Sequence, residues 1–289
     1  MNPAVAWADA PCDESPTTLR GRVETLAANP QRTHDALTLL AEVRDALERG
    51  EIRVAENSGD GWMVHRWVKE ALLLHLTLGQ AAAQPEPFTG VEFDTLPWHA
   101  GSVTGCRIPG GSLIRHGAYL ALGVTCMPPS VIQMGAWIGE GSTIDSHALI
   151  GAGAQIGSRV SVGCGAVIGG LLRPVDALPT IIEDDVVLGG GCGVYDGVQV
   201  GQGSILVAGT VITPLFGVFD AENQTWLRAE EGRPLRIPPF SVVAMGARSM
   251  PGGSADTLVH VPMILGRRVD GEARSAEAAQ NLEPSAPWR

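Results

Sequence analysis

The stretch IQMGAWIGEGSTIDSHALIGAGAQIG, residues 132–157, places an isoleucine at every sixth position. An α-helix repeats every 3.6 residues and would spread these isoleucines around its surface. A single strand turns every second residue to the same side, but strands end after about five or six residues. The interval of six therefore indicates an element in which the chain changes direction after each short strand.

The same interval continues on both sides of this stretch. Eleven consecutive positions carry an aliphatic residue or a cysteine, namely Ile108, Ile114, Leu120, Cys126, Ile132, Ile138, Ile144, Ile150, Ile156, Val162 and Ile168. A second run comprises Ile182, Leu188, Val194, Val200, Leu206 and Ile212. A repeat of six residues is typical of a parallel β-helix, in which three hexapeptides close one triangular coil. We therefore predict a mainly β protein of this fold.

The repeat divides the chain into three parts. Residues 1–100 are predicted to form an N-terminal α-helical domain and a linker, because their apolar residues recur at intervals of three and four. The β-helix is assigned to 101–250, with excursions near 170–181 and 213–237, where the interval of six is interrupted. Residues 251–289 are predicted to be a short C-terminal segment and tail.

The composition argues against several classes of function. The net charge is −11 and Lys69 is the single lysine, so the chain lacks the basic surface on which nucleic-acid binding depends. No CxxC pair occurs, and the two histidines inside the repeat are too few for a zinc site, so we expect no metal. We find neither a secretion signal nor an apolar stretch long enough to span a membrane, and expect a cytoplasmic protein.

Several stretches resemble tetrahydrodipicolinate N-succinyltransferases, enzymes of the lysine and diaminopimelate pathway. These stretches are ALERGEIRVAENSGDGWMVHRWVKEALLL, IRHGAYLALGVTCMPPSVIQMGAWIGEGSTIDSHALIGAGAQIG, VIGGLLRPVDALPTIIEDDVVLG, IPPFSVVAMG and HVPMILGRRVDGEAR. The resemblance extends from residue 40 to 275. Its most specific motif is P-x-x-A-x-P-T-I-I-E-D, residues 174–184, which begins within the first excursion.

The resemblance implies a left-handed parallel β-helix of hexapeptide repeats. It also implies a homotrimer with active sites in clefts between neighbouring prisms. A coenzyme A thioester, succinyl-CoA or acetyl-CoA, would be the co-substrate and would lie along the coils. The acceptor would be the amine of a tetrahydrodipicolinate-like amino dicarboxylate or of a lysine-related amino acid.

An acid and an imidazole stand two residues apart in this otherwise apolar repeat, at Asp145 and His147. Asp145 occupies the acidic position of the family motif (V/I)-D-(T/S)-x-A, which implies that it orients the acceptor amine and accepts its proton. The alternative is an ordinary turn residue, since Asp is common at turns. His147 stands where the family usually has tryptophan, so it is either a polar substrate contact or a half-exposed turn residue.

The family pattern is broken at a second acidic motif. Relatives read A-R-S-E-V-V-E-G where this chain reads GGGCGVYDG, residues 189–197. Gly193 replaces the family glutamate, and Asp196 matches the second acid of the motif. We therefore expect Asp196 to be a second catalytic acid. We also expect open space above Gly193, which would alter the choice of substrate or abolish activity.

Further residues are assigned to ligand binding. Arg115, which matches a family position, and Arg173, which stands where an acid is expected, are candidates for the substrate carboxylates, because a guanidinium clamps a carboxylate with two hydrogen bonds. The residues assigned to the coenzyme are Ala208, Gly209, Thr210, Gly246 and Arg248. Arg159, Arg267 and Arg268 are weaker candidates for anionic groups.

The resemblance implies a CoA-dependent N-acyltransferase that works by direct attack of an amine on a thioester. The altered motif favours a specialised-metabolite pathway derived from lysine biosynthesis for the acceptor. The rival hypothesis is a catalytically degenerate trimeric paralogue that serves as a ligand-binding or scaffold protein. The choice between a succinyl and an acetyl donor stays open at this point.

Overall fold

The computed structural model describes residues 17–59, 61–79, 105–230, 232–249 and 258–268. Its N-terminal part contains the helices α1 (Leu19–Ala28), α2 (His34–Glu48) and α3 (Arg66–Gly79). Thr18 and Thr33 cap the first two helices, because each hydroxyl accepts a hydrogen bond from a backbone amide of the first turn. The expected linker and the tail from residue 269 lie outside the described residues.

The sequence predicted an α-helical N-terminal part, but the structure also contains two strands there. Strands β1 (Ala55–Asn57) and β2 (Trp62–Val64) form an antiparallel hairpin between α2 and α3. Gly59 and Gly61 in the turn have positive φ angles, which glycine adopts at no steric cost. The hairpin is too short to show a period, and for that reason pattern analysis missed it.

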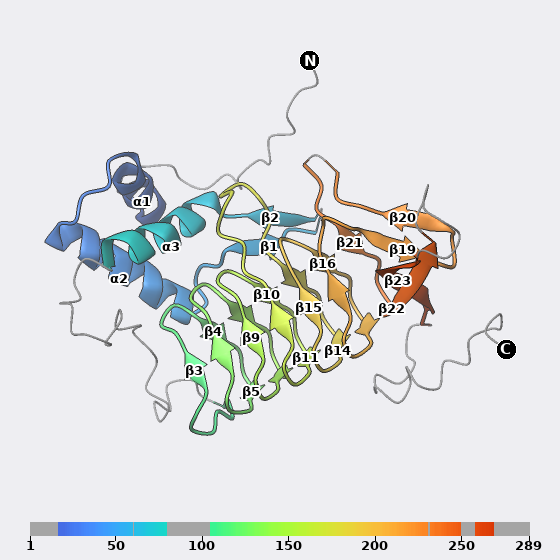
Figure 1. Cartoon of the computed structure of the whole chain (residues 1–289). Coiled ribbons are helices and arrows are strands. Elements are labelled where there is room, and N and C mark those ends of the chain that lie inside the picture. Colours follow the sequence, from blue (N-terminus) through green and yellow to red (C-terminus); the bar gives the residue numbers. More distant parts are fainter. Residues whose placement is uncertain (1–16, 60, 80–104, 231, 250–257, 269–289) are drawn as a thin grey trace, which may run out of the picture.

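The central part is a triangular prism of short parallel strands, as the interval of six predicts (Figure 1). Face 1 consists of β5 (Thr125–Cys126), β8 (Thr143–Ile144), β11 (Ser161–Val162), β14 (Val187–Leu188), β17 (Ile205–Leu206) and the start of β22 (Ser241–Ser249). Face 2 consists of β3 (Leu113–Ile114), β6 (Val131–Ile132), β9 (Leu149–Ile150), β12 (Val167–Ile168), β15 (Gly193–Val194) and β18 (Val211–Ile212). Face 3 consists of β4 (Tyr119–Leu120), β7 (Trp137–Ile138), β10 (Gln155–Ile156), β13 (Ile181–Ile182), β16 (Gln199–Val200) and β21 (Arg236–Ile237).

The second residue of each short strand points into the prism and is buried, which confirms the prediction of the core positions. Ile132, Ile138, Ile144, Ile150 and Ile156 are all 0% exposed, so the isoleucines that define the repeat form one continuous column. Burial of an isoleucine stabilises the fold by about 1.5–3 kcal/mol relative to an exposed one. The architecture is the predicted left-handed parallel β-helix.

The two excursions leave the register of the coils intact. Val167 pairs with Gly193 across the first excursion, and Val200 pairs with Ile237 across the second. The second excursion contains an antiparallel hairpin of β19 (Val218–Asp220) and β20 (Thr225–Leu227).

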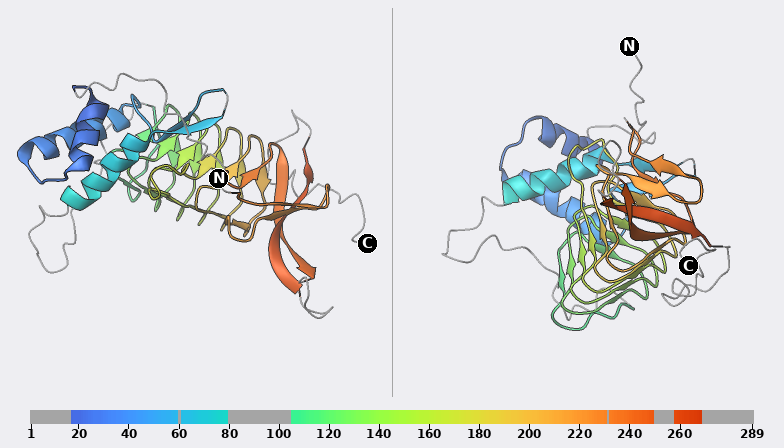
Figure 2. Two further views of the ribbon diagram at one scale, coloured as in Figure 1. Left: turned by 90° about the horizontal axis from the view of Figure 1, so that it is seen from above. Right: turned by 45° about the vertical axis from the view of Figure 1, so that its right-hand side comes forward.

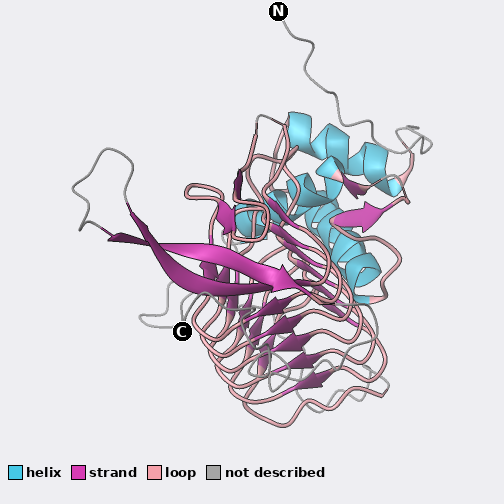
Figure 3. Cartoon of the chain, turned by 90° about the vertical axis from the view of Figure 1, so that its right-hand side faces the viewer, coloured by secondary structure: helices cyan, strands magenta, loops and turns pink. Residues whose placement is uncertain are grey.

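The last strand of face 1 does not turn with the coil. β22 pairs with β17 at Val242 and Val243, then continues straight and pairs with β23 (Leu258–Arg267). The resulting β22–β23 hairpin projects beyond the prism (Figure 2) and crosses its C-terminal end (Figure 3). The prism therefore ends with the first residues of β22, although the sequence assigned the β-helix as far as residue 250.

The corners where the chain passes between faces are named edges 1–2, 2–3 and 3–1. The first excursion, the second excursion and parts of α2 and α3 lie on edge 2–3. Leu47 of α2 approaches Gly117 there, and Leu72 of α3 approaches Gly135. The β1–β2 hairpin lies against face 3, where Trp62 bonds Glu183. Among the described residues, the contacts of the N-terminal part with the prism thus lie on edge 2–3 and face 3, and none lies on edge 1–2.

Among the described helices, none has the length and apolarity needed to cross a membrane.

Candidate active site

Asp145 begins the turn on edge 1–2 that follows strand β8. Its backbone amide bonds the carbonyl of Val162 in the next coil, and its Oδ1 accepts a hydrogen bond of 2.7 Å from the amide of Ser146. The side chain is half-buried, and within the described residues no arginine, lysine or histidine forms an ion pair with it. One carboxylate oxygen is therefore fixed by the turn, while the other remains available to a ligand.

His147 is exposed and has a φ angle of 63°, in the left-handed region. The same position in the coils above is occupied by Gly165, Gly191 and Gly209, whose φ angles are also positive. His147 thus occupies a place that the next coils give to glycine. Histidine is among the residues that tolerate this conformation, so the turn itself explains part of its presence.

Edge 1–2 above Asp145 is built almost without side chains. A Cβ on Gly163 or Gly189 would lie within 3 Å of the backbone of the next coil, so these positions admit no side chain. A Cβ on Gly165, Gly191 or Gly209 would meet nothing within 4 Å, so open space lies in front of them. The edge therefore exposes backbone to any ligand that lies along it.

The predicted coenzyme residues Ala208, Gly209 and Thr210 lie on this same edge, three coils above Asp145. With neighbouring strands 4.7–4.9 Å apart, the separation along the prism is about 14 Å. Ala208 and Gly209 are exposed, whereas Thr210 is buried and donates hydrogen bonds to the carbonyls of Val207 and Val243. Thr210 thus fixes the turn, and its two neighbours form the accessible surface.

Gly246 and Arg248 lie in the part of β22 that extends past edge 1–2. A Cβ on Gly246 would lie 2.2 Å from Sδ of Met263, so the glycine is required by the packing of β23. The guanidinium carbon of Arg248 lies 3.5 Å from the ring centroid of Phe219 in β19. Arg248 therefore has a structural contact that the sequence did not suggest, a cation–π interaction.

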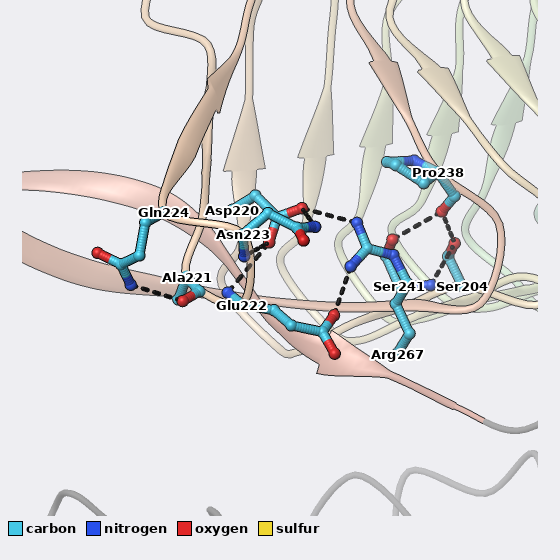
Figure 4. A network of polar contacts seen from close by, with 9 residues as sticks. All are labelled: Ser204, Asp220, Ala221, Glu222, Asn223, Gln224, Pro238, Ser241 and Arg267. Carbon is cyan, nitrogen blue, oxygen red and sulfur yellow. Dashed lines mark hydrogen bonds and ion pairs between the residues drawn. The ribbon is translucent and has the colours of Figure 1, made fainter.

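Arg267 and Asp220 join the two hairpins at this end of the molecule (Figure 4). Nη2 of Arg267 lies 2.6 Å from Oδ2 of Asp220, which is 2% exposed, and its Nη1 bonds Glu222. Arg159 on edge 3–1 is paired in the same manner with Asp185. Arg268 donates a hydrogen bond to the carbonyl of Gly203. These three arginines are engaged in holding the fold.

The other predicted residues lie on edge 2–3. Arg115 follows β3, is half-buried and donates a hydrogen bond of 3.1 Å to Gln133, and burial lowers its pKa. Asp196 follows β15 and is exposed, with a φ angle of 52°. Arg173 is exposed in the first excursion. Within one chain, Asp196 and Arg173 are therefore separated from Asp145 by the full width of face 2.

The expected space above Gly193 is filled, which corrects the sequence analysis. The ring of Tyr195 folds back over β15, so that a Cβ on Gly193 would lie 2.5 Å from Cε2 and 3.0 Å from the hydroxyl oxygen. Gly193 is buried although it belongs to the outward positions of face 2. The sequence alone did not predict this, because nothing in a linear motif shows that the ring of Tyr195 covers the residue two places earlier.

Lys69 is the second residue whose role the sequence did not reveal. Its side chain is fully buried, and its Nζ donates hydrogen bonds to the carbonyls of Pro174 at 3.1 Å and Ala177 at 2.6 Å. Burial lowers its pKa to about 8. Lys69 thus ties α3 to the first excursion on edge 2–3.

A cavity of about 450 Å³ lies between the β1–β2 hairpin and face 3. Arg53 forms one wall, where its guanidinium carbon is 4.1 Å from the ring centroid of Trp137 and its Nε donates to Gln155. Burial lowers the pKa of Arg53 to about 10. None of the predicted site residues lines this cavity, and its polar walls are bonded to one another, as in the contact of Trp62 with Glu183.

Within the described part of the chain, no group of three or more His, Cys, Asp or Glu side chains is arranged to hold a metal ion.

Three family models match the chain. One described as tetrahydrodipicolinate N-succinyltransferase N-terminal matches residues 22–78. Another, bacterial transferase hexapeptide (six repeats), matches 135–170, and the third, hexapeptide repeat of succinyl-transferase, matches 179–214. The matches cover the helical part and both runs of the repeat.

Curated relatives match over most of the length. The chain is 32% identical over 252 residues to a 2,3,4,5-tetrahydropyridine-2,6-dicarboxylate N-succinyltransferase of Methylorubrum extorquens, covering 83% of this chain and 87% of that protein. It is 34% identical over 254 residues to an enzyme of the same name from Nitrobacter hamburgensis, covering 82% and 86%.

Among solved structures, a hexapeptide-repeat acetyltransferase of Vibrio cholerae complexed with acetyl coenzyme A matches 51% of this chain and 72% of that one, at 20% identity and a TM-score of 0.32. The identity and coverage of the curated relatives settle the classification. The chain belongs to the tetrahydrodipicolinate N-succinyltransferase family of hexapeptide-repeat acyltransferases.

Proposed function

We propose that the protein is a CoA-dependent N-acyltransferase that acylates the amine of an amino dicarboxylate. The acceptor is the ring-opened form of tetrahydrodipicolinate or a lysine-related amino acid, and the donor is succinyl-CoA or acetyl-CoA. Family membership gives acyl transfer as the reaction class. The observation that carries the assignment of the site is the carboxylate of Asp145 on edge 1–2, below three turns (163–166, 189–192 and 207–210) whose exposed residues are glycine and alanine apart from Cys164.

The chemistry requires one proton acceptor beside the amine. An ammonium group cannot attack a thioester, so the nitrogen must lose a proton before it reacts. In the proposed step the nitrogen attacks the thioester carbonyl carbon, the N–C bond forms and the C–S bond breaks. Asp145 takes the proton that the ammonium loses before it attacks. The second proton, which the nitrogen loses once the N–C bond has formed, passes to the sulfur, so that coenzyme A leaves as the thiol. One oxygen of Asp145 is already held by the amide of Ser146, which leaves the other oxygen to accept the first proton.

The open backbone of edge 1–2 suits an extended thioester. Exposed amides and carbonyls near Gly165, Gly191 and Gly209 offer hydrogen bonds to the amide groups of a pantetheine arm without obstruction by side chains. Ala208 and Gly209 then lie along the arm, and Arg248 on the projecting hairpin is placed near the distal phosphates. His147, at the level of the acceptor, contributes either a polar contact or a turn.

We further propose a homotrimer in which face 2 turns toward the threefold axis. Face 2 carries exposed Leu113 and Val211, an apolar surface of the kind that copies of a chain bury against each other. In a cyclic trimer of this kind, edge 1–2 of one prism meets edge 2–3 of the next. Arg115, Arg173 and Asp196 of one copy would then face Asp145 of its neighbour.

The test is release of free thiol from acetyl-CoA and succinyl-CoA in the presence of amino dicarboxylates and lysine-like amines. The proposal expects release with at least one donor and acceptor pair, and a product amide by mass spectrometry. Absence of thiol release with every pair would contradict it.

A second candidate function follows from one observation, the absence of the family glutamate at Gly193. In this alternative the protein is a trimeric ligand-binding or scaffold protein without catalytic activity. It predicts that acyl-CoA still binds, because edge 1–2 is intact, while no acyl group is transferred. Binding measured by calorimetry together with the thiol assay separates the two candidates.

A further inference from the structure

The side chain of Tyr195 lies on the outer surface of face 2 rather than extending away from the prism. Its Cα and Cδ1 lie 3.1 Å from the Cβ position of Gly169, and its Cε2 lies 2.5 Å from that of Gly193. The ring therefore runs backwards along β15, from the side of edge 2–3 toward the side of edge 1–2. Val167 and Val211 flank Gly193 in the neighbouring strands.

The position of Tyr195 is fixed by its backbone. Its amide donates to the carbonyl of Ile212 in the next coil, and its carbonyl accepts from Val198 within the turn. Any side chain on Gly193 would collide with the ring, so the glycine and the tyrosine depend on each other. The change from the family motif is thus a paired exchange, in which a glutamate is lost and a phenol hydroxyl takes its place.

The exchange alters what the surface offers to a ligand. An ionised carboxylate only accepts hydrogen bonds and repels anions, whereas a phenol hydroxyl also donates. The hydroxyl of Tyr195 ends above Gly193, next to the turn on edge 1–2 that contains Gly191. This turn lies two coils from that of Asp145, about 10 Å along the prism.

We propose that Tyr195 is a specificity-determining residue of the acceptor subsite, where its hydroxyl donates a hydrogen bond to a carboxylate or carbonyl oxygen of the substrate. The inference rests on the proposed acyl transfer for its kinetic consequences, but binding alone also tests it. A subsite with glutamate at this point would repel such an oxygen, and the phenol attracts it.

The binding test uses the fact that the chain contains two tyrosines. Fluorotyrosine labelling therefore gives two ¹⁹F resonances, and Tyr119→Phe assigns them because it removes one of the two. Tyr119 lies on face 3, where its ring is stacked on Trp137 with centroids 4.0 Å apart. The full-length protein is titrated with pimelate, which carries two carboxylates and no amine, and with cadaverine, which carries two amines and no carboxylate. The Tyr195 resonance is expected to move with pimelate and not with cadaverine.

The kinetic test compares three variants with the parent chain. Tyr195→Phe removes only the hydroxyl, and we expect KM for a dicarboxylate acceptor to rise about tenfold with a smaller change in kcat. Tyr119→Phe is the matched control and leaves both constants unchanged. Gly193→Glu combined with Tyr195→Val restores the family pair without the collision, and shifts preference away from the acceptor that the parent prefers.

The outcomes separate this inference from the proposed function. If the parent releases no thiol with any pair while pimelate still moves the Tyr195 resonance, the proposed catalysis is wrong and the carboxylate subsite stands. The inference is wrong if three results hold together: the parent is active, Tyr195→Phe leaves KM unchanged for every acceptor, and the Tyr195 resonance does not respond to pimelate. A response to cadaverine alone also overturns it, because the ligand group would then be cationic.

Discussion

Edges 1–2 and 2–3 of the prism come from the same hexapeptide repeat but are built in opposite ways. Edge 1–2 keeps four-residue turns in the five coils from residue 127 to 210, and the exposed residues of its last three turns are glycine and alanine apart from Cys164. Edge 2–3 carries both excursions and the contacts of α2 and α3. One edge exposes its backbone, and the other is covered with inserted chain.

The difference assigns different tasks to the two edges. A regular edge with stacked turns is rigid, because each turn bonds the one below it, as Gly165 does to Ser146. A decorated edge supplies charged side chains at variable positions, such as Arg173 and Asp196. On the proposed function, edge 1–2 would bind the acyl-CoA and edge 2–3 would adjust the choice of acceptor.

The largest expected effect comes from edge 1–2. Asp145→Asn keeps the hydrogen bond from Ser146 through its amide oxygen but removes the proton acceptor. We expect kcat/KM to fall by about 100-fold or more, the usual contribution of a general base. Steady-state thiol release measures the loss, and circular dichroism checks that the fold is unchanged. Full turnover in this variant would exclude Asp145 as the base.

The second prediction tests whether the two edges meet between copies. Asp145→Asn on edge 1–2 and Asp196→Asn on edge 2–3 are produced in one cell as chains with different tags. If each site uses one edge from each of two copies, one of the three sites in every mixed trimer has both acids intact. Activity of the purified mixed trimers should then approach about a third of the parent value.

The contrary outcome of that experiment is equally clear. If both acids act within one chain, or if Asp196 has no role, the mixture shows only the mean activity of the two variants. Purification through both tags ensures that mixed assemblies are measured. Size-exclusion chromatography with light scattering gives the number of copies in the same sample.

The sequence predicted the prism because its core positions are chemically uniform. Ile132 through Ile156 recur without a break, and hydrophobic burial alone fixes their direction. The same reasoning placed Asp145 on an edge. It could not place Tyr195, since the direction of an outward ring depends on its neighbours in adjacent coils, which are 18 or more positions away in the chain. The β1–β2 hairpin escaped for a related reason, because its pairing is set by a turn and by contacts with face 3.

A third prediction concerns how edge 2–3 is held. Lys69→Met removes the hydrogen bonds to Pro174 and Ala177, and leaving these two carbonyls unbonded costs about 1–2 kcal/mol at pH 10. The pKa of Lys69 in the folded chain is about 8, lowered by burial from 10.5. Between these values the unfolded chain binds more protons than the folded one, so the stability of the parent rises with pH across this window.

The variant lacks this titration, so the difference in unfolding free energy between parent and Lys69→Met should grow from pH 7 to pH 10. Urea unfolding at several pH values measures it. Lys69→Arg is the control, because it retains a donor but stays charged throughout. If the difference in unfolding free energy does not depend on pH, the pKa of Lys69 is not lowered in the folded chain.

A smaller effect is expected at Cys164, which is exposed on edge 1–2 between Gly163 and Gly165. Cys126 and Cys192 are buried, and burial raises the pKa of both thiols, so they react slowly. In a Cys12→Ser background, a maleimide should therefore label Cys164 first. An acyl-CoA bound along edge 1–2 should slow this labelling severalfold, whereas free pimelate should not. Equal rates with and without acyl-CoA would move the thioester away from this edge.

The smallest effect distinguishes a turn residue from a ligand contact at His147. His147→Gly relieves the left-handed strain at a φ angle of 63° and should stabilise the fold by about 0.5 kcal/mol, the strain less the entropy that glycine loses. Arg159→Gly is the matched control on edge 3–1, where the φ angle is 56°. This change also breaks the ion pair with Asp185, so we expect no increase in stability. If His147→Gly is more stable and KM for the acceptor is unchanged, the histidine serves the turn alone. A rise in KM despite the added stability would assign it to the substrate, and edge 1–2 would then contribute to acceptor choice as well as to binding of the thioester.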